Sequence, residues 1–419
     1  MNALTLAIAS IRARPLYAAL CTTAVAAGIA LLCAAFLFSQ SISTGFQRNA
    51  ENIDMVAGAK GSPLQLILSS VYHADIPAGN ITMNDYENLL RMPQIRKAIP
   101  VAMGDSYNGY RMIGSTADYL KIYEAEFADG EIFDAPFEAV AGAQTGLKTG
   151  QDIVVSHGFS ANSEDVHDTE PYEITGVLKR TGTVLDNLIV TNLENVQQLH
   201  GHHHHDDKHE EEEHHHDDEH VHEDAHEDTD EADLERQLTS VLIKVRSPVD
   251  LMNLPRRIND SSNIMAAVPS YEIARFTKSL GVGKQLAIVL GAGFVILSTL
   301  MLWATLASGL ALRRYDLAVL RVLGARPGRL AATVIAEAVI ISGVGAVAGA
   351  ILGHLIAYSA VISFENLNRF IVPESLLLPS TMDIGFILLG VLAGLFAALV
   401  PSVTAARTNI STLLAKGRV

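Results

Sequence analysis

Four long segments of this 419-residue chain carry at most one charged residue each, and they limit the folds open to it. Three of them, Pro15 to Gln47, Gln285 to Leu312 and Ile384 to Ala406, contain no Asp, Glu, Lys or Arg. The remaining one, Leu330 to Phe364, has Glu337 as its only charge. A helix of about 20 apolar residues spans the hydrocarbon core of a bilayer. We therefore expect four transmembrane helices.

The first segment predicts a membrane anchor rather than a cleaved signal peptide, because its apolar run exceeds the roughly 7 to 15 residues of the apolar region of a signal peptide. Orientation follows from the flanking basic residues, since cytoplasmic flanks of membrane helices are rich in Lys and Arg. Both termini are then cytoplasmic, and residues 42–283 form one large extracytoplasmic domain. The basic residues in question are Arg12, Arg14, Arg313, Arg314, Arg321, Arg326, Arg329, Arg407, Lys416 and Arg418.

The extracytoplasmic domain alternates helix-like and strand-like patterns. A helix is expected over Met83 to Arg91, and strands over Ile153 to Val155, Tyr172 to Leu178, Leu188 to Thr191 and Val241 to Val245. The fold class we predict is an α-helical membrane protein with four transmembrane helices plus a large mixed α/β extracytoplasmic domain.

The two cysteines cannot form a disulfide within their helix. Cys21 and Cys33 lie twelve positions apart in the first apolar segment. Twelve helical residues rise roughly 18 Å, which is far beyond the reach of a disulfide. The extracytoplasmic domain contains no cysteine, so it must fold without disulfides.

Residues 200–235 hold 12 of the 16 histidines of the chain, together with 17 acidic residues and one lysine. With 46 acidic and 30 basic residues in total, this stretch accounts for the whole net charge of −16. It has no apolar periodicity, so we expect a disordered loop inserted between two strands of the domain.

Clustered imidazoles beside carboxylates predict a metal-binding loop. Zinc is the metal we favour, with copper and nickel as alternatives, and no other cofactor is expected. The competing interpretation is a solvated acidic spacer. The candidate ligands are His202, His203, His204, His205, His209, His214, His215, His216, His220, His222 and His226.

A short amphipathic helix is expected at residues 311–326, between the second and third apolar segments. Leu312 to Ala325 interleaves leucine and valine with charged side chains and ends near Gly324. In the third segment, Gly345, Gly349 and Gly353 recur every four residues, which lets another helix approach that face closely. Gly390 and Gly394 repeat the spacing in the fourth segment.

Three sequences carry a resemblance to a known family. They are LAIASIRARPLYAALCTTAVAAGIAL (Leu6 to Leu31), RRYDLAVLRVLGARPGRLAATVIAEAVIISGVGAVAGAILG (Arg313 to Gly353) and LVPSVTAARTNISTLLA (Leu399 to Ala415). With the order of one helix, a large outer domain and three further helices, they resemble the FtsX-like/MacB permease family of ABC transporters. The resemblance covers nearly the full chain. Within this family the chain resembles lipoprotein-releasing and macrolide-export type permeases. The His-rich insert is the chief departure.

The resemblance implies a division into residues 1–41 (cytoplasmic N-terminus and first helix), 42–283 (MacB-like domain) and 284–419 (FtsX-like permease domain). It implies a multi-pass protein of the bacterial inner membrane that acts as a homodimer or in a pair with another permease. It also implies a separate cytoplasmic ABC ATPase that docks on the short amphipathic helix. The implied coupling residues are Arg313, Arg314, Tyr315, Asp316, Leu317, Leu320, Arg321 and Gly324.

No phosphate-binding motif G-x-x-x-x-G-K-[ST] is present, so ATP hydrolysis must come from another polypeptide. Three smaller signals have two interpretations each. Glu337 is either a structural group near the inner interface or a relay, and His354 is either a hydrogen-bonded packing side chain or a metal ligand with no second ligand evident. Val56 to Asn80 is either a partner-facing or lipid-facing surface or ordinary domain core.

Three functions remain open. The first is a permease for zinc or other transition-metal homeostasis, with a periplasmic metal-binding protein or cargo as partner and membrane lipid around the helices. The second is a lipoprotein-releasing or efflux permease. The third is a mechanical transmitter that activates a periplasmic partner without transport. None of the three involves nucleic acid.

Overall fold

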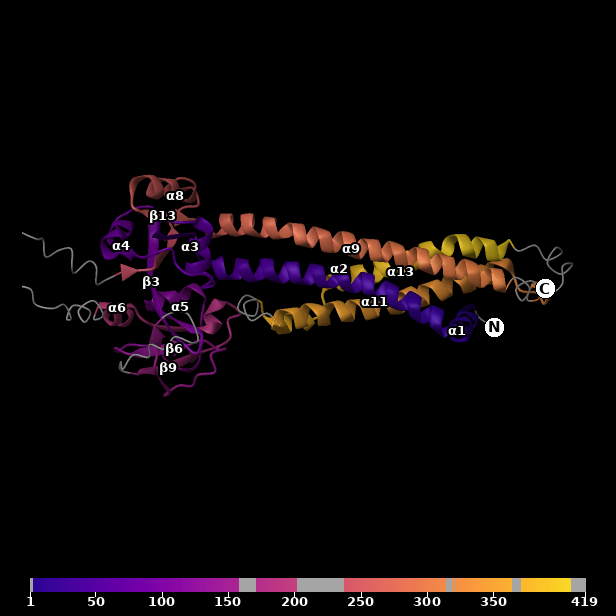
Figure 1. Cartoon of the computed structure of the whole chain (residues 1–419), viewed down its shortest axis with the longest axis horizontal. Helices are drawn as coiled ribbons and strands as arrows, with labels where there is room; N and C mark the ends of the chain where they lie inside the picture. Colours follow the sequence, from indigo (N-terminus) through magenta and orange to yellow (C-terminus); the bar gives the residue numbers. More distant parts are fainter. Residues whose placement is uncertain are drawn as a thin grey trace, which may run out of the picture. The chain divides into compact units, whose positions relative to one another are not determined.

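The computed structural model describes residues 3–157, 171–201, 237–313, 319, 321–363 and 371–407. The chain divides into two compact units (Figure 1). The helical unit comprises Met1–Ile42, Ser279–Asn368 and Val372–Val419, and the sheet unit comprises Ser43–Lys278 with Arg369–Ile371.

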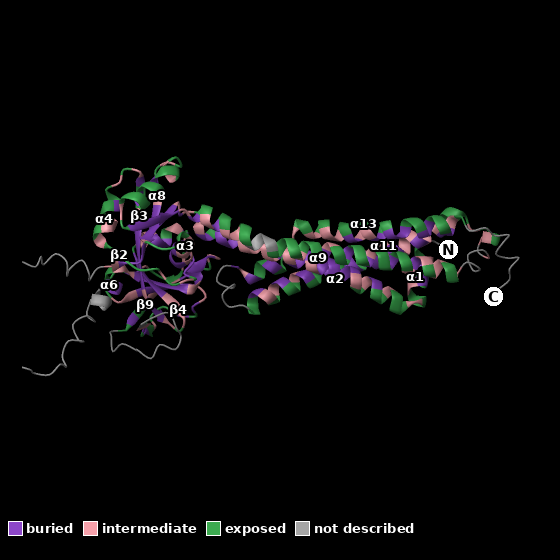
Figure 2. Ribbon diagram, turned by 45° about the horizontal axis from the view of Figure 1, so that its top comes forward, coloured by how far each residue is buried: buried purple, intermediate pink, exposed green. Residues whose placement is uncertain are grey.

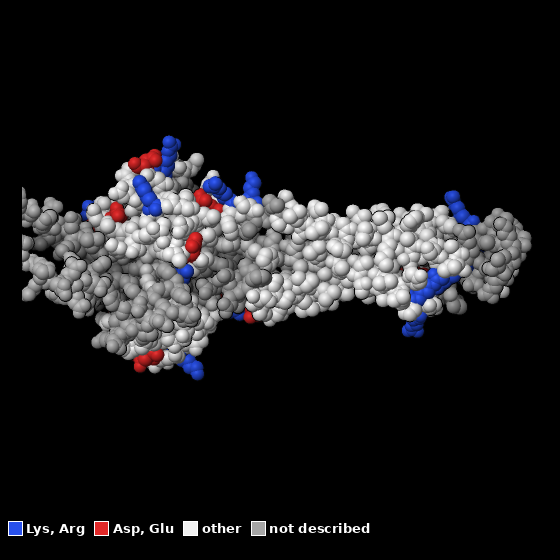
Figure 3. Space-filling view, in the orientation of Figure 1, with Lys and Arg blue, Asp and Glu red and all other residues white. Residues whose placement is uncertain are grey.

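The described part of the helical unit is built from long apolar helices. Four of them are long and apolar enough to cross a membrane, as predicted. In Figure 3 most of the visible surface of this unit carries neither red nor blue atoms, and basic side chains gather at one of its ends. The elements that contribute to it are α1 (Ala3–Ala13), α2 (Pro15–Ala50), α9 (Pro269–Leu312), α11 (Pro327–Ser363), η3 (Pro373–Leu377) and α13 (Thr381–Ala406).

Helix boundaries differ from the apolar segments because backbone hydrogen bonding continues past the residues that suit a bilayer. The helix α9 begins at Pro269, sixteen residues before Gln285, and includes the charged residues that precede the apolar run. The helix α11 begins at Pro327, since proline has no N–H to lose at a first helical position. The short helix α1 was not predicted at all, and it packs against α11.

The predicted glycine faces lie at helix contacts within the helical unit. A Cβ on Gly349 would lie 2.6 Å from the Ala26 carbonyl oxygen of α2. A Cβ on Gly345 would lie 2.8 Å from the carbonyl oxygen of Thr22, also in α2. On α13, Gly390 and Gly394 face α11 in the same way. The absence of side chains at these positions is what allows α2, α11 and α13 to pack this closely.

The sheet unit contains, among the described residues, one sheet of eleven strands and a separate pair. The order in the large sheet is β13-β1-β12-β3-β4-β10-β6-β9-β5, with β7 beside β9 and β8 beside β3. The strands are β1 (Met55–Ala59), β2 (Ile81–Thr82), β3 (Ile95–Tyr107), β4 (Tyr110–Ser115), β5 (Phe127–Gly130), β6 (Glu138–Ala141), β7 (Asp152–Ile153), β8 (Ser156–His157), β9 (Tyr172–Leu178), β10 (Leu188–Asn192), β11 (Gln237–Leu238), β12 (Ser240–Val245) and β13 (Ile264–Ala267).

Most strand pairs are antiparallel, and β4 with β10 and β6 with β9 are parallel. The register of β1 against β12 pairs Met55 with Ile243, which places buried apolar side chains opposite one another. Figure 2 shows the resulting buried centre of this unit in purple. Its helices are α3 (Pro63–Ser70), α4 (Met83–Leu90), α5 (Ala117–Ile122), η1 (Val184–Asn187), α6 (Leu193–Gly201) and α8 (Asp250–Ser261).

Most of the predicted elements of this domain are present. The helix α4 begins with a capping box in which Thr82 and Asp85 bond each other's backbone N–H groups. Strands β9, β10 and β12 lie where the alternation indicated. The predicted strand Ile153 to Val155 was wrong: β7 ends at Ile153, and Val154 is 45% exposed. Three apolar residues are too few to predict where strand pairing ends.

The apolar part of the Val56 to Asn80 segment packs in the domain core, whereas residues 60–63 and most of residues 74–80 are exposed. The segment includes β1, which pairs with β12 and β13, and α3, in which Leu66 and Ile67 are buried. His73 is also buried, and its Nε2 lies 2.8 Å from the Tyr119 hydroxyl. Of the two interpretations of this segment, packing is the one that the structure supports.

Candidate coupling site

The predicted coupling residues lie where α9 gives way to α11. Arg313 directly follows the end of α9, and Arg321 is helical. Gly324 has a φ of +97°, a left-handed conformation that glycine adopts without strain, and it precedes α11. The other coupling residues, Arg314, Tyr315, Asp316, Leu317 and Leu320, lie outside the described residues.

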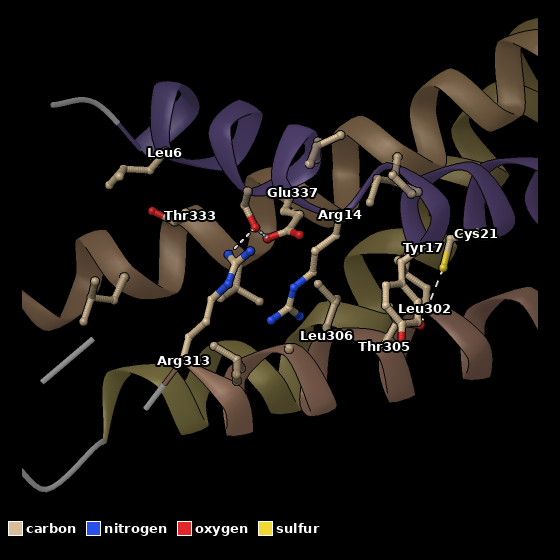
Figure 4. A pocket seen from close by; sticks show the side chains of 18 residues that line it. Leu6, Arg14, Tyr17, Cys21, Leu302, Thr305, Leu306, Arg313, Thr333 and Glu337 are labelled. Carbon is tan, nitrogen blue, oxygen red and sulfur yellow. Dashed lines mark hydrogen bonds between the residues drawn. The ribbon is translucent and has the colours of Figure 1, made fainter. Parts of the chain in front are cut away.

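A cavity of 160 Å³ lies at this end of the helical unit (Figure 4). Residues of α1, α2, α9 and α11 line it, and most of them are apolar. Two arginines and one glutamate also line it: Arg14, Arg313 and Glu337. In Figure 4 both arginine side chains extend into the space between the helices. The side chains of a predicted coupling residue and of the intramembrane carboxylate therefore share one cavity.

Three side chains form a continuous polar chain across this cavity. Arg313 Nη1 donates a hydrogen bond of 2.5 Å to the hydroxyl oxygen of Ser10. The Ser10 hydroxyl donates in turn to Glu337 Oε2 at 2.8 Å. Ser10 is buried, so these bonds lie where water competes weakly with them. A guanidinium and a carboxylate linked through one hydroxyl offset each other's charge.

This chain of bonds ties three parts of the sequence together. Ser10 belongs to α1, Glu337 to α11, and Arg313 is the first residue of the predicted coupling segment. These hydrogen bonds link the start of that segment to α1 and α11. The site thus holds an arginine, a serine and a glutamate that are linked by hydrogen bonds.

A second set of contacts fixes the end of α2 within the sheet unit. The buried Asn49 accepts a hydrogen bond from the Val184 backbone N–H at 2.8 Å and donates one to the Gly45 carbonyl. Tyr72 donates from its hydroxyl to the Phe46 carbonyl at 2.9 Å. These bonds join the last turn of α2 to the core of the sheet unit, which sequence patterns did not indicate.

The predicted metal ligands of the His-rich loop, His202 through His226, all lie outside the described residues. His354 is described and makes two contacts: its Nδ1 lies 2.5 Å from the Leu376 carbonyl oxygen, and its Nε2 lies 3.1 Å from Asp383 Oδ2. It is thus a hydrogen-bonded side chain, as the packing interpretation held. The expectation that no second ligand lies near it was wrong, because Asp383 and Cys33 both lie beside it.

Two family models match the chain. The MacB-like periplasmic core domain matches residues 18–260, and the FtsX-like permease C-terminal domain matches residues 288–410. The chain belongs to the FtsX/MacB-type permeases of ABC transporters. Members of this family work with a cytoplasmic ABC ATPase, and the multi-pass character of the chain agrees with its four apolar helices.

Two solved structures resemble part of this FtsX/MacB-type permease. One is the extracellular domain of the noncanonic ABC-type transporter YknZ from Gram-positive bacteria, with 12% identity and a TM-score of 0.29, covering 51% of this chain and 98% of that one. The other is the periplasmic region of MacB from Actinobacillus actinomycetemcomitans, with 10% identity and a TM-score of 0.33, covering 55% of this chain and 97% of that one. No curated protein matches the permease. At these TM-scores the membership rests on the two family models.

Proposed function

We propose that this permease is the membrane subunit of an ABC system for zinc or other transition-metal homeostasis. A separate cytoplasmic ATPase docks on the segment that begins at Arg313, and two permease subunits carry its closure to the extracytoplasmic domains. The His-rich loop of residues 200–235 collects metal on the outer side of the bacterial inner membrane. Both termini of the chain face the cytoplasm.

The observation that carries the coupling part is the Arg313–Ser10–Glu337 chain of hydrogen bonds. It connects the docking segment to two helices of the membrane unit through partly buried hydrogen bonds. The helix α2 then contains residues of both units, and its last turn is bonded to the sheet-unit core. The continuous helix α2 is the element through which we propose that coupling reaches the extracytoplasmic domain.

The support for the metal part is compositional. Twelve histidines within residues 200–235 exceed what an acidic spacer needs, since Asp and Glu alone would keep such a stretch solvated. Neutral imidazole is the usual ligand of zinc, and the adjacent carboxylates serve as further ligands or orient the rings.

Coupling is tested by purifying the full-length permease from its native membranes with its partners. We expect an ABC ATPase to co-purify and ATP hydrolysis to depend on the permease. Ser10→Ala removes the hydroxyl that joins Arg313 to Glu337, and the loss of about 1 kcal/mol of hydrogen bonding predicts a several-fold fall in that hydrolysis.

Ser298→Ala is the matched control for Ser10→Ala. Ser298 is also a buried serine of the helical unit, but its hydroxyl bonds only the Val295 carbonyl of its own helix. It should leave ATP hydrolysis unchanged. Equal rates in wild type and Ser10→Ala would contradict the coupling route.

Metal collection is tested by replacing every histidine of residues 200–235 with glutamine while all 17 acidic residues stay. We expect the wild-type permease to bind several zinc ions at pH 7 and far fewer at pH 5, because the ligand is neutral imidazole. The glutamine variant should lose this binding, and cells that carry it should grow poorly under zinc limitation. Unchanged binding and growth would favour the efflux or mechanical-transmitter alternatives.

A further inference from the structure

A second group of metal-binding side chains lies inside the helical unit, far along the chain from the His-rich loop. Cys33 of α2, His354 of α11 and Asp383 of α13 offer one ligand atom each, and all three atoms lie within 4.8 Å of one another. All three residues are buried or nearly so, with side-chain exposures of 12% for His354 and 13% for Asp383.

The hydrogen bond at one ring nitrogen of His354 determines the state of the other. A carbonyl oxygen can only accept, so Nδ1 carries the hydrogen that it gives to Leu376 O. This arrangement, with Nδ1–H on a backbone carbonyl, is the one that orients Nε2 as a metal ligand in many metal sites. In a neutral ring, Nε2 then presents a lone pair.

That lone pair faces another electron-rich atom. Asp383 Oδ2 lies 3.1 Å from Nε2 and already accepts the Ser380 backbone N–H at 2.6 Å as the cap of α13. Two lone pairs at this distance repel unless a positive centre lies between them. That centre is either a proton, which would make an imidazolium–aspartate pair, or a metal ion.

Cys33 distinguishes the two arrangements. Its Sγ lies 3.8 Å from Asp383 Oδ1 and 3.8 Å from the Ala350 carbonyl oxygen, with no exposed surface. A proton shared by His354 and Asp383 needs no thiol beside it, whereas sulfur is the ligand that zinc and other late first-row metals prefer. Gly353 makes the approach of Cys33 to α11 possible, since a Cβ there would lie 2.7 Å from Cys33 Cβ and 3.0 Å from its Sγ.

We infer that Cys33, His354 and Asp383 form a binding site for a divalent transition-metal ion, with zinc as the preferred occupant. A thiolate, a carboxylate and a neutral imidazole together carry two negative charges, which a divalent ion neutralises in a poorly hydrated site. Three protein ligands leave one position of a tetrahedral zinc open to water or to a transported ligand. An ion held there links α2, α11 and α13.

This site does not depend on the proposed role of the His-rich loop, and a spectroscopic probe separates the two. Cobalt(II) bound to a thiolate gives an intense near-ultraviolet charge-transfer band, which imidazole and carboxylate ligands do not give. The loop contains no cysteine, and Cys21 and Cys33 are the only two in the chain. A thiolate–cobalt band therefore reports the helical unit alone, even in the full-length protein.

The experiment adds cobalt(II) to the full-length, metal-stripped permease in detergent. We expect a thiolate–cobalt band that zinc in excess over all the proposed sites abolishes. Cys33→Ser should remove the band, and His354→Gln should weaken cobalt affinity more than about tenfold. Cys21→Ser is the matched control, since Cys21 is equally buried but bonds only Thr305, and it should keep the band.

Several results would overturn the site. The absence of the band in wild-type permease would do so however well the variants fold. A band that survives Cys33→Ser, or that disappears only in Cys21→Ser, would place the metal elsewhere. Loss of zinc binding by the loop variant with the band intact would support both proposals. Zinc binding then reports the loop, and the thiolate–cobalt band reports the site in the helical unit.

Discussion

Single polar side chains in this permease bridge elements that lie far apart in the sequence. Ser10 and Glu337 are 327 positions apart, and Asn49 and Val184 are 135 apart. The Asn49–Val184 bond is buried and the Ser10–Glu337 bond is partly buried, so water compensates poorly for the loss of either partner. We therefore expect substitutions of such side chains to lower the stability of the folded permease.

Asn49→Ala should destabilise the sheet unit. The substitution leaves the buried Val184 N–H unpaired, which costs about 1 to 3 kcal/mol. Thermal unfolding of the full-length permease in detergent measures the effect. The control is Asn88→Ala, at an exposed asparagine of α4, which should change stability by less than about 0.5 kcal/mol. Similar unfolding temperatures for the two variants would contradict the role given to Asn49.

Asp118→Asn should change the acid dependence of stability. Hydrogen bonds from Lys97 and Lys121, both at 2.9 Å, lower the pKa of Asp118 below its ordinary value. Because the pKa is lower in the folded than in the unfolded chain, the contribution is present above the unfolded value near about 4 and is lost as the pH falls through the folded value.

The Asp118→Asn variant should thus be less stable than wild type by under about 1 kcal/mol at neutral pH, since the pair is partly exposed. The difference should shrink as the pH is lowered below about 4. Denaturant unfolding at several pH values measures it. Glu87→Gln, at an exposed helix pair with Arg91, serves as the comparison. A difference that grows toward acid would reverse the sign and refute this assignment.

At the scale of elements, the backbones of neighbouring helices approach closely at glycines, and this close packing holds the helical unit together. The helix α11 meets α2 along Gly345, Gly349 and Gly353, and it meets α13 at Gly390 and Gly394. Apolar side chains gain little by leaving lipid for a helix contact, so close packing and not hydrophobicity joins helices in a bilayer. Any atom added at these positions separates the helices.

Gly349→Ala should weaken the contact between α2 and α11. The added Cβ would lie 2.6 Å from the Ala26 carbonyl oxygen and 2.9 Å from Ile29 Cβ, and overpacking of this kind costs about 1 to 3 kcal/mol. The matched control is Gly343→Ala in the same helix, where the nearest atom would be at 3.7 Å. Thermal stability in detergent should fall for the first variant only, and an equal fall in both would show that the contact is unimportant.

At the scale of the whole molecule, the arrangement across the membrane sets which parts meet the ATPase and which meet external metal. The basic flanks predict that residues 42–283 are outside and that the segment between α9 and α11 is inside. Native Cys21 and Cys33 are fully buried, so introduced cysteines can be labelled over a low background.

Asp260→Cys and Arg326→Cys test this orientation. Both residues are exposed, the first in the sheet unit and the second just before α11. A membrane-impermeant maleimide should label the cysteine at position 260 in intact spheroplasts and the one at position 326 only after the membrane is permeabilised. The reverse pattern would exclude cytoplasmic docking at Arg313 and external capture by the His-rich loop together.

Local patterns in the sequence were sufficient for the spans, for α4, and for β9, β10 and β12. Each depends on residues within a few positions of one another, where hydropathy and spacing act directly. Local patterns were insufficient for the start of α9, for α1 and for the end of β7. In those places backbone hydrogen bonding either extends beyond the apolar residues or ends before the last of them.

The sequence alone determined that this protein lies in a membrane with four helices. The free energy of transferring a charge-free segment into lipid is a sum of contributions from its own residues. It also determined the family and the unusual charge of residues 200–235. Only the tertiary structure decided that Arg313, Ser10 and Glu337 join, and that Cys33 lies against Asp383, 350 positions away. These contacts depend on the rotation of each helix about its axis and on the distance to its neighbours. Steric packing among all the helices determines both.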